Sequence, residues 1–171
     1  MNDDEPNPHP SARPSIELAT VRDAVALASL SRDFVEAGLS WRYRPERMAA
    51  LIREPNSAVV LVRDGKLIAA FAAMTFGTGI AHLLLLCVHP QQRRRGLATA
   101  LLDWLEQSAR VAGIQRTVLE VRARNNAART FYRELGFAEH LYLERYYDGV
   151  EAAFRMTRDL NADRTSRTLS R

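Results

Sequence analysis

The apolar positions along the chain switch repeatedly between two periods. Some short runs alternate or are continuously apolar, as in strands, whereas others repeat every three to four residues, as in amphipathic helices. The pattern predicts, in chain order, a strand at 15–19, a helix at 21–37, a short helix from 45, strands at 57–63, 66–76 and 83–88, a helix at 96–112, a strand at 117–121, a helix between Asn125 and Gly136, and strands at 137–145 and 150–158. This order, β-α-α-β-β-β-α-β-α-β-β, predicts a mixed α/β fold.

Punctuating residues set several of these boundaries. Thr20 is a candidate N-cap and Gly38 a candidate stop for the first helix. Pro45 suits the first position of the second helix, where its missing amide hydrogen costs no hydrogen bond. Asp64-Gly65 predicts a β-hairpin, and Gly77-Thr78-Gly79 predicts the turn into the next strand.

The segment 83–102, LLLLCVHPQQRRRGLATALL, carries the strongest chemical signal. Its apolar run predicts a strand buried on both faces, which ends at His89-Pro90 because proline cannot donate to a sheet ladder. Three arginines and Gly96 then lead into a helix. Free amides at a helix start, the helix dipole and arginine together favour a phosphorylated ligand. The spacing matches neither the P-loop nor the dinucleotide-binding pattern.

A second motif lies in the segment 115–137, QRTVLEVRARNNAARTFYRELGF. Glu120 is a carboxylate inside an otherwise apolar strand. Asn125 is suited to cap the following helix, and Gly136 is suited to end it in a left-handed conformation. The apolar positions of that helix are Ala128, Phe131, Tyr132 and Leu135.

Composition bounds the remaining possibilities. The 171 residues suit one domain, expected at 15–160, with disordered tails at 1–14 and 161–171. The net charge of +4 combines 24 basic with 20 acidic residues, and Lys66 is the only lysine, so we expect no nucleic-acid partner. No apolar run is long enough for a membrane span, the acidic, proline-rich start is unlike a signal peptide, and the single cysteine excludes an internal disulfide. A cytoplasmic location is the resulting expectation.

Two motifs at this separation resemble the GNAT superfamily of acyl-CoA-dependent N-acetyltransferases. The matching elements are Arg93-x-x-Gly96-x-Ala98 and Asn125-x-x-Ala128-x-x-Phe131-Tyr132-x-x-x-Gly136-Phe137. The resemblance implies a central mixed sheet of six to seven strands. It also implies that the two central parallel strands, around Leu86 and Glu120, splay apart to admit acetyl-CoA as co-substrate.

The stretch LEVRARNNAARTFYRELGF with Arg145-Tyr146-Tyr147-Asp148-Gly149 resembles, more narrowly, the ribosomal-protein alanine N-acetyltransferases and related protein N-terminal acetyltransferases. This resemblance covers roughly residues 83–158. The part of the chain before it, which shapes the acceptor groove in this fold, has no comparable match. The acceptor is therefore left open by the motifs.

The resemblance assigns the pyrophosphate of acetyl-CoA to the backbone amides of residues 94–99, the pantetheine to the backbone near Leu86 and Val88, and the oxyanion to the Val88 amide. Arg129 and the arginine cluster are candidates for the 3′-phosphate, or are simply solvated. The residues implied in cofactor binding are Leu86, Val88, Arg93, Arg94, Arg95, Gly96, Leu97, Ala98, Thr99, Asn125 and Ala128. No metal is expected. His82 and His89 are isolated from other potential metal-ligating residues, so neither is assigned a role.

Tyr132 is the candidate general acid for the departing thiolate, with a packed core tyrosine as the alternative. Glu120 is the candidate general base, acting directly or through water, with an ion pair to Arg122 or Arg124 as the alternative. Cys87 is expected in the core, because its neighbours are apolar.

Trp41, Tyr43, Tyr146 and Tyr147 are candidates to line the acceptor groove, or else lie at the edge of the core. A protein α-amine has an ordinary pKa of about 7.7–8.0, against about 10.4 for lysine, so a modest base suffices for it. We therefore expect acetyl transfer from acetyl-CoA to a protein or peptide N-terminus. The alternatives are a small-molecule amine acetyltransferase, a lysine acetyltransferase and a non-catalytic acetyl-CoA sensor. A monomer or a homodimer is compatible with the sequence.

Overall fold

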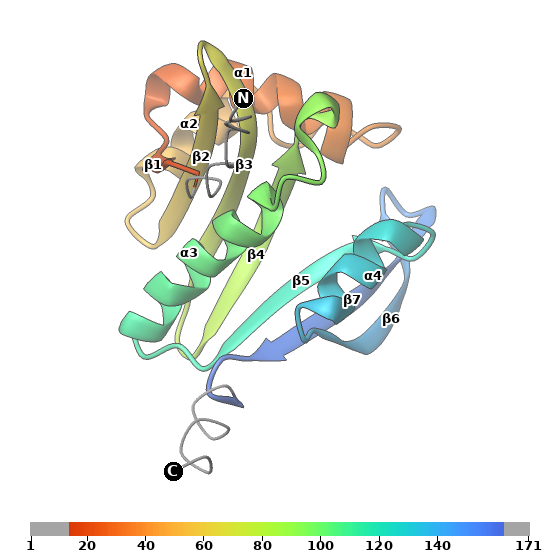
Figure 1. The fold of residues 1–171 in the computed structure, drawn as a ribbon. Coiled ribbons are helices and arrows are strands. Elements are labelled where there is room, and N and C mark those ends of the chain that lie inside the picture. Colours follow the sequence, from red (N-terminus) through yellow and green to blue (C-terminus); the bar gives the residue numbers. More distant parts are fainter. Residues whose placement is uncertain (1–13, 163–171) are drawn as a thin grey trace, which may run out of the picture.

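A seven-stranded mixed sheet forms the centre of the computed structural model, which describes residues 14–162 (Figure 1). The strands are β1 (Ile16–Leu18), β2 (Ser57–Asp64), β3 (Leu67–Phe76), β4 (Ile80–Val88), β5 (Arg116–Arg122), β6 (Ala138–Tyr147) and β7 (Glu151–Asp159), in the spatial order β1-β2-β3-β4-β5-β7-β6. The helical elements are the 3-10 turn η1 (Val21–Asp23), α1 (Ala24–Leu30), the π turn η2 (Ser31–Val35), α2 (Pro45–Arg53), the 3-10 turn η3 (Pro90–Gln92), α3 (Leu97–Val111) and α4 (Asn126–Glu134). The predicted fold class and element order are confirmed.

The helices cover the two faces of the sheet in pairs (Figure 1). Helices α1 and α2 pack on one face through a core cluster that includes Leu27, Met48 and Phe71. On the other face, α3 and α4 pack through Leu101, Tyr132 and other residues of a second cluster. Each helix therefore buries one apolar stripe, which is what the helical spacing of its apolar residues predicts.

The sheet opens between its two central parallel strands. β4 and β5 pair only at their beginnings, from Ile80 with Arg116 to His82 with Val118. Beyond His82, β4 stays paired with β3 and β5 stays paired with β7, so the two halves of the sheet diverge. This gap is the splay that the GNAT resemblance implies (Figure 1).

A β-bulge at Leu84 lies at the start of this opening. Ala73 pairs with Leu85 and Met74 with Leu83, so Leu84 is an extra residue in β4. Leu83 packs into the α3–α4 core, whereas Leu84 and Leu85 both face the α1–α2 core. Leu83, Leu85 and Cys87 are buried, whereas Leu84, Leu86 and Val88 are half-buried, so the predicted burial on both faces is confirmed only in part. The bulge shifts the alternation of the strand and bends it.

The first predicted helix, 21–37, is not regular. It consists of η1, α1 and η2 in succession and ends at Val35. The last turn widens because the amide of Glu36 donates to the carbonyl of Ser31 at 2.7 Å, an i to i+5 hydrogen bond. The Ser31 hydroxyl donates to the Glu36 carboxylate at 2.9 Å, which holds this widened turn in the core.

Most other local predictions are confirmed. Pro45 occupies the first turn of α2, and Gly136 ends α4 with a φ of +88°. The hairpin turn itself is Gly65-Lys66, because Asp64 still pairs with Leu67 across the ladder. The proposed tails, 1–14 and 161–171, lie outside the described residues except for Pro14, Asn161 and Ala162, so the domain limits stay a prediction. None of the helices within 14–162 has the length and apolar character needed to cross a membrane.

Candidate active site

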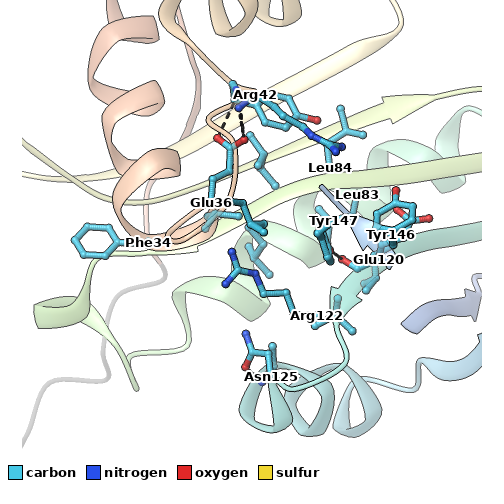
Figure 2. A pocket seen from close by; sticks show the side chains of 18 of the residues that line it. Phe34, Glu36, Arg42, Leu83, Leu84, Glu120, Arg122, Asn125, Tyr146 and Tyr147 are labelled. Atoms are coloured by element: carbon cyan, nitrogen blue, oxygen red, sulfur yellow. Dashed lines mark hydrogen bonds between the residues drawn. The ribbon is translucent and has the colours of Figure 1, made fainter. Parts of the chain in front are cut away.

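A cleft of about 250 Å³ opens where β4 and β5 separate (Figure 2). Its walls come from η2 and the loop after it, from β4 and β5, from the start of α4 and from the end of β6. Eight of the residues predicted for the site line it: Tyr43, Leu86, Glu120, Asn125, Ala128, Tyr132, Tyr146 and Tyr147. Both predicted catalytic residues therefore reach one cavity from different elements.

Glu120 lies on β5 with its side chain only 6% exposed. Its Oε1 accepts a hydrogen bond from Nε of Arg155 at 2.7 Å, and its Oε2 lies 2.6 Å from Nε2 of His82. Burial on its own raises the pKa of this carboxyl, but the hydrogen bonds and charges of His82 and Arg155 outweigh it and lower the pKa below the usual value. Glu120 is therefore an ionised, firmly held carboxylate at neutral pH.

The partners of Glu120 differ from those that the sequence suggested. Arg122 and Arg124 both pair with Glu151, with closest nitrogen–oxygen distances of 3.9 and 2.7 Å. The reason is geometric: Arg155 is the direct cross-strand neighbour of Glu120 on β7. His82 reaches Glu120 from β4, so this histidine is not isolated in the structure. A histidine on a strand parallel to that of a buried carboxylate was the only available signal for this pair.

Tyr132 reaches the cleft from α4 and is 9% exposed. Its ring meets those of Phe131 and Phe137 edge-on, at centroid distances of 5.2 and 5.6 Å. Burial, with a smaller contribution from Tyr147, raises the pKa of its hydroxyl well above the usual value. Tyr132 is thus packed in the core and also keeps its proton at neutral pH, so the two readings of this residue are compatible.

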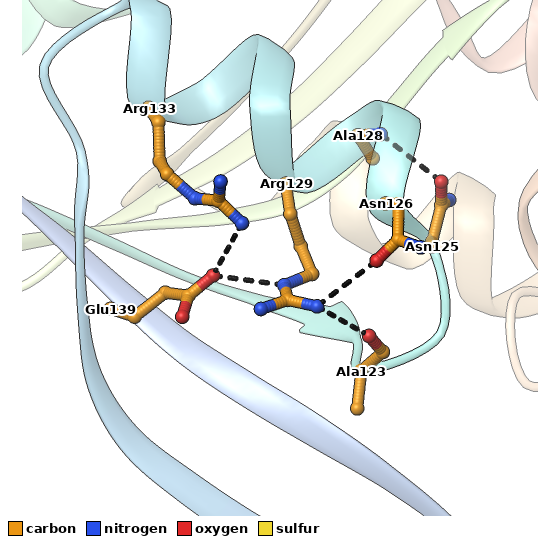
Figure 3. Close-up of polar contacts among 7 residues, drawn as sticks. All are labelled: Ala123, Asn125, Asn126, Ala128, Arg129, Arg133 and Glu139. Atoms are coloured by element: carbon orange, nitrogen blue, oxygen red, sulfur yellow. Dashed lines mark hydrogen bonds and ion pairs between the residues drawn. The ribbon is translucent and has the colours of Figure 1, made fainter.

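Asn125 begins α4 as predicted: its Oδ1 accepts the amide hydrogen of Ala128 at 3.1 Å (Figure 3). The guanidinium of Arg129, on the same helix, is engaged by groups of the protein itself. It donates to Glu139 at 2.8 Å, to the Ala123 carbonyl at 2.9 Å and to Asn126 at 3.1 Å (Figure 3). Its guanidinium also lies 4.3 Å from the ring centroid of Phe154. Arg129 therefore anchors α4 to β6 and β7 and is a poor candidate for a phosphate.

The arginine loop before α3 has the backbone that a phosphate site needs. Gly96 has a φ of +72° and Arg94 a φ of +62°, so the chain turns through two left-handed residues before the helix starts at Leu97. A Cβ placed on Gly96 would meet no atom of the described chain within 4 Å, so the glycine is needed for its φ and leaves open space beside it. The first amides of α3 have no intrahelical acceptor and are available to an anion. Arg93, Arg94 and Arg95 are exposed, whereas Leu97 is buried and Ala98 and Thr99 are half-buried.

The amides of Leu86 and Val88 point into the gap. The amide of His89 donates to the Ala69 carbonyl at 2.9 Å, so this pair is hydrogen-bonded in the β3–β4 ladder. Because such pairs alternate along an antiparallel ladder, the N–H groups of Leu86 and Val88 face away from β3. They face the side on which β5 has diverged, which fits strand-like pairing with an extended ligand. Val88 and the arginine loop lie beyond the cleft lined by Glu120 and Tyr132.

The predicted aromatic groove is only partly assembled. Tyr43, Tyr146 and Tyr147 line the cleft, and the rings of the last two meet edge-on at 4.9 Å. Tyr147 also donates its hydroxyl hydrogen to the Glu120 carbonyl at 3.2 Å. Trp41 is placed elsewhere: it packs beside the α1–α2 core, with the guanidinium of Arg32 5.2 Å from its ring centroid.

Glu36 is a site residue that the sequence analysis missed. It is 7% exposed, and its carboxylate accepts the amide of Arg42 at 2.7 Å and that of Tyr43 at 3.3 Å (Figure 2). It thereby holds the loop 37–44 in place as one wall of the cleft. Its position at the end of η2 follows from the π turn, which the sequence pattern did not reveal.

Cys87 is buried as expected. Among the described residues, no group of three or more histidine, cysteine, aspartate or glutamate side chains is placed to hold a metal ion.

The splayed sheet, the left-handed turn before α3 and the cleft between β4 and β5 define a class of acyl-CoA-binding transferase folds. Residues 25–137 match the acetyltransferase (GNAT) family, and the chain belongs to that family. It is 35% identical over 111 residues to the uncharacterized N-acetyltransferase MJ1530 of Methanocaldococcus jannaschii, a match that covers 63% of this chain and 70% of that protein.

The ribosomal protein bS18-alanine N-acetyltransferase of Escherichia coli K12 is 39% identical over 99 residues, which cover 56% of this chain and 66% of the relative. The crystal structure of the E. coli ribosomal-protein-S18-alanine N-acetyltransferase superposes with a TM-score of 0.74 at 27% identity, over 85% of this chain and 93% of that one. The PaiA N-acetyltransferase of Thermoplasma acidophilum, crystallised with coenzyme A, shares the fold with a TM-score of 0.72 at 20% identity, over 85% of this chain and 98% of that one.

Proposed function

We propose that this protein transfers the acetyl group of acetyl-CoA to the α-amine of a protein or peptide N-terminus. The observation that carries the proposal is the pairing, in one cleft, of an ionised carboxylate centre at Glu120 with a protonated phenol at Tyr132. Direct transfer needs a group that removes a proton from the acceptor ammonium and a group that gives a proton to the leaving thiolate. The Glu120 side chain, with its partner His82, reaches the cleft from β5 and Tyr132 reaches it from α4, so the cleft holds groups for both roles.

Acetyl-CoA, when bound, supplies the activated thioester. The residues of this chain fit it at three places. The α3 amides and the left-handed turn at Arg94 and Gly96 suit the pyrophosphate. The inward amides of Leu86 and Val88 suit the pantetheine, with Val88 as the proposed oxyanion donor. Asn125 and Ala128 line the cleft at the start of α4.

The α-amine is favoured over other acceptors by two considerations. Its ordinary pKa lies closer to neutral pH than that of lysine, so less free energy is needed to deprotonate it at neutral pH. The E. coli relative is named a ribosomal protein bS18-alanine N-acetyltransferase, and 99 residues of this chain match it at 39% identity. Tyr43, Tyr146 and Tyr147 are then the proposed contacts for the first residues of the acceptor. A cytoplasmic site of action and the absence of a nucleic-acid partner are part of the same proposal.

The test combines calorimetry of acetyl-CoA binding with thiol release against three panels: N-terminal peptides, peptides with an internal lysine and a blocked N-terminus, and small amines. We expect binding, and thiol release that depends on a free peptide α-amine. Release with small amines alone would assign the enzyme to small-molecule acetylation. Binding without any release would indicate a sensor, and absence of binding would refute the site at α3.

A further inference from the structure

We propose that His82 accepts the proton of the acceptor amine on its Nδ1 atom, and that Glu120 acts through this imidazole. The inference rests on the proposed acetyl transfer and defines which atom of the Glu120 centre receives the proton. His82 lines the cleft, and its side chain is 37% exposed, compared with 6% for Glu120. The imidazole is therefore the member of the pair that an acceptor meets first.

Both oxygens of Glu120 are already engaged. Oε1 accepts from Arg155 at 2.7 Å and Oε2 contacts His82 at 2.6 Å. The same contacts hold the pKa of the Glu120 carboxyl low despite its burial, which makes it a weak base. A carboxylate that is buried, doubly bonded and stabilised in its charged form is suited to hold a cation beside it and poorly suited to take up a proton itself.

The contact also fixes the tautomer of His82. An ionised carboxylate only accepts hydrogen bonds, so Nε2 is the donor in this pair. A neutral imidazole with its hydrogen on Nε2 has its lone pair on Nδ1. Within residues 14–162, Nδ1 has no hydrogen-bond partner, so it is available to an acceptor in the cleft.

The location on the strands supports this role. His82 is the last residue of β4 that pairs with β5, opposite Val118. Glu120 lies two residues after Val118 on β5. The His82–Glu120 pair therefore lies at the base of the gap that opens where β4 and β5 separate. Besides Glu120 and its partner Arg155, the titratable or charged side chains that line the cleft come from several elements: Glu36, Arg42, Tyr43 and Arg47 from the α1–α2 side, Arg122 from β5, Tyr132 from α4, and Tyr146 and Tyr147 from β6.

The proton balance is as follows. The acceptor ammonium gives one proton to Nδ1 of His82, and Glu120 stabilises the resulting imidazolium. The neutral nitrogen forms the new C–N bond as the C–S bond of the thioester breaks. The hydroxyl of Tyr132 protonates the thiolate, and the second proton of the nitrogen replaces the one that Tyr132 gave up. His82 then releases its proton to solvent, so one proton is liberated in each turnover.

His82→Gln separates this role from a structural one. Glutamine retains an N–H donor for Glu120 but cannot accept a proton at neutral pH. With an N-terminal peptide at pH 7, we expect kcat to fall by about a hundredfold or more, the range typical of a lost general base. The activity of the variant should rise with pH only as the acceptor amine deprotonates, so its pH profile should differ from that of the wild type. His140→Gln, on the exposed strand β6, is the matched control and should leave the profile unchanged.

A second readout needs neither co-substrate nor acceptor. In the ligand-free protein at neutral pH, ¹⁵N NMR of the imidazole assigned by His82→Gln should show the Nε2–H tautomer, because the Glu120 carboxylate accepts from Nε2.

An Nδ1–H tautomer, or a His82→Gln enzyme with kcat within twofold of wild type and an unchanged pH profile, would overturn the proposal. If the ring behaves as expected but no acceptor is acetylated, the failure lies in the proposed function. Wild-type acetylation combined with an Nδ1–H tautomer would instead overturn the His82 role alone.

Discussion

Asp148 and Ser40 meet across the mouth of the cleft, although 108 residues separate them in the chain: the Ser40 amide donates to Oδ2 of Asp148 at 2.6 Å. Oδ1 of Asp148 lies 3.6 Å from the guanidinium of Arg42. The turn between β6 and β7 is thereby tied to the loop after η2, which carries Tyr43. The same turn follows Tyr146 and Tyr147, so this contact sets the relative position of the two walls that we assign to the acceptor.

Loosening this contact should weaken acceptor binding. Asp148→Ala removes both interactions, and we expect KM for an N-terminal peptide to rise several-fold while kcat and the Kd of acetyl-CoA change little. Asp148→Asn should have a smaller effect, because asparagine tolerates the φ of +52° found here and can still accept the Ser40 amide. Steady-state kinetics with calorimetry measures both quantities. A changed acetyl-CoA affinity with an unchanged KM would contradict the assignment of this mouth to the acceptor.

Tyr132→Phe tests the general acid. Phenylalanine preserves the edge-on contacts with Phe131 and Phe137 and removes only the hydroxyl. We expect kcat to fall about a hundredfold or more, since the thiolate then leaves without a proton donor. Acetyl-CoA affinity and the melting temperature should stay close to wild type. A variant with wild-type turnover would show that the hydroxyl has no catalytic role.

Gly96 and Gly113 form a natural comparison, because they flank the two ends of α3 with φ values of +72° and +77° and open space around each. A glutamate at either position should cost about 1 kcal/mol of unfolding free energy through the left-handed backbone. Only Gly96→Glu should lower acetyl-CoA affinity, by at least about tenfold, because its carboxylate competes with phosphate at the helix start. Denaturant titration and calorimetry separate the two effects. Equal acetyl-CoA affinity in both variants would remove the phosphate assignment.

Cys87 should be chemically inert in the folded protein. Burial raises the pKa of its thiol to about 12, and the side chain lies in the α1–α2 core. Since the thiolate is the reactive form, a disulfide reagent at pH 8 should modify the native protein at least about a hundredfold more slowly than the chain in guanidinium. Rapid modification of the native protein would mean that this part of the core opens easily.

The Glu139 cluster should contribute a small, pH-dependent stability. Hydrogen bonds from Arg129 and Arg133 lower the pKa of the Glu139 carboxyl in the folded state, with Arg129 the larger cause and burial opposing it. The stabilisation is therefore present above the unfolded pKa and is lost as the pH falls through the lower, folded value. Glu139→Gln should reduce the unfolding free energy at pH 7 by less than about 1 kcal/mol, because the pair is near the surface. The difference from wild type should shrink towards pH 3; a difference that persists there would point to packing instead of charge.

The features that depend on a few neighbouring residues could be predicted from the sequence. Asn125 caps α4 and Gly136 ends it because caps and left-handed positions follow from the conformational preferences of single residues. The same holds for Gly96 before α3, for Pro45 in α2 and for the order of strands and helices. These local motifs also carried the family resemblance, since the cofactor half of the site is built from consecutive residues.

Only the tertiary structure decided which side chains meet across strands. Glu120 finds His82 at a separation of 38 residues and Arg155 at a separation of 35, while the nearer Arg122 and Arg124 turn to Glu151. The registers of β4 with β5 and of β5 with β7 set these pairings, and a shift of one residue would move every side chain to the other face. The hydrophobic pattern of a strand defines its faces but not its neighbour's register. The chemistry at Glu120 therefore could not be resolved until β4, β5 and β7 were placed side by side.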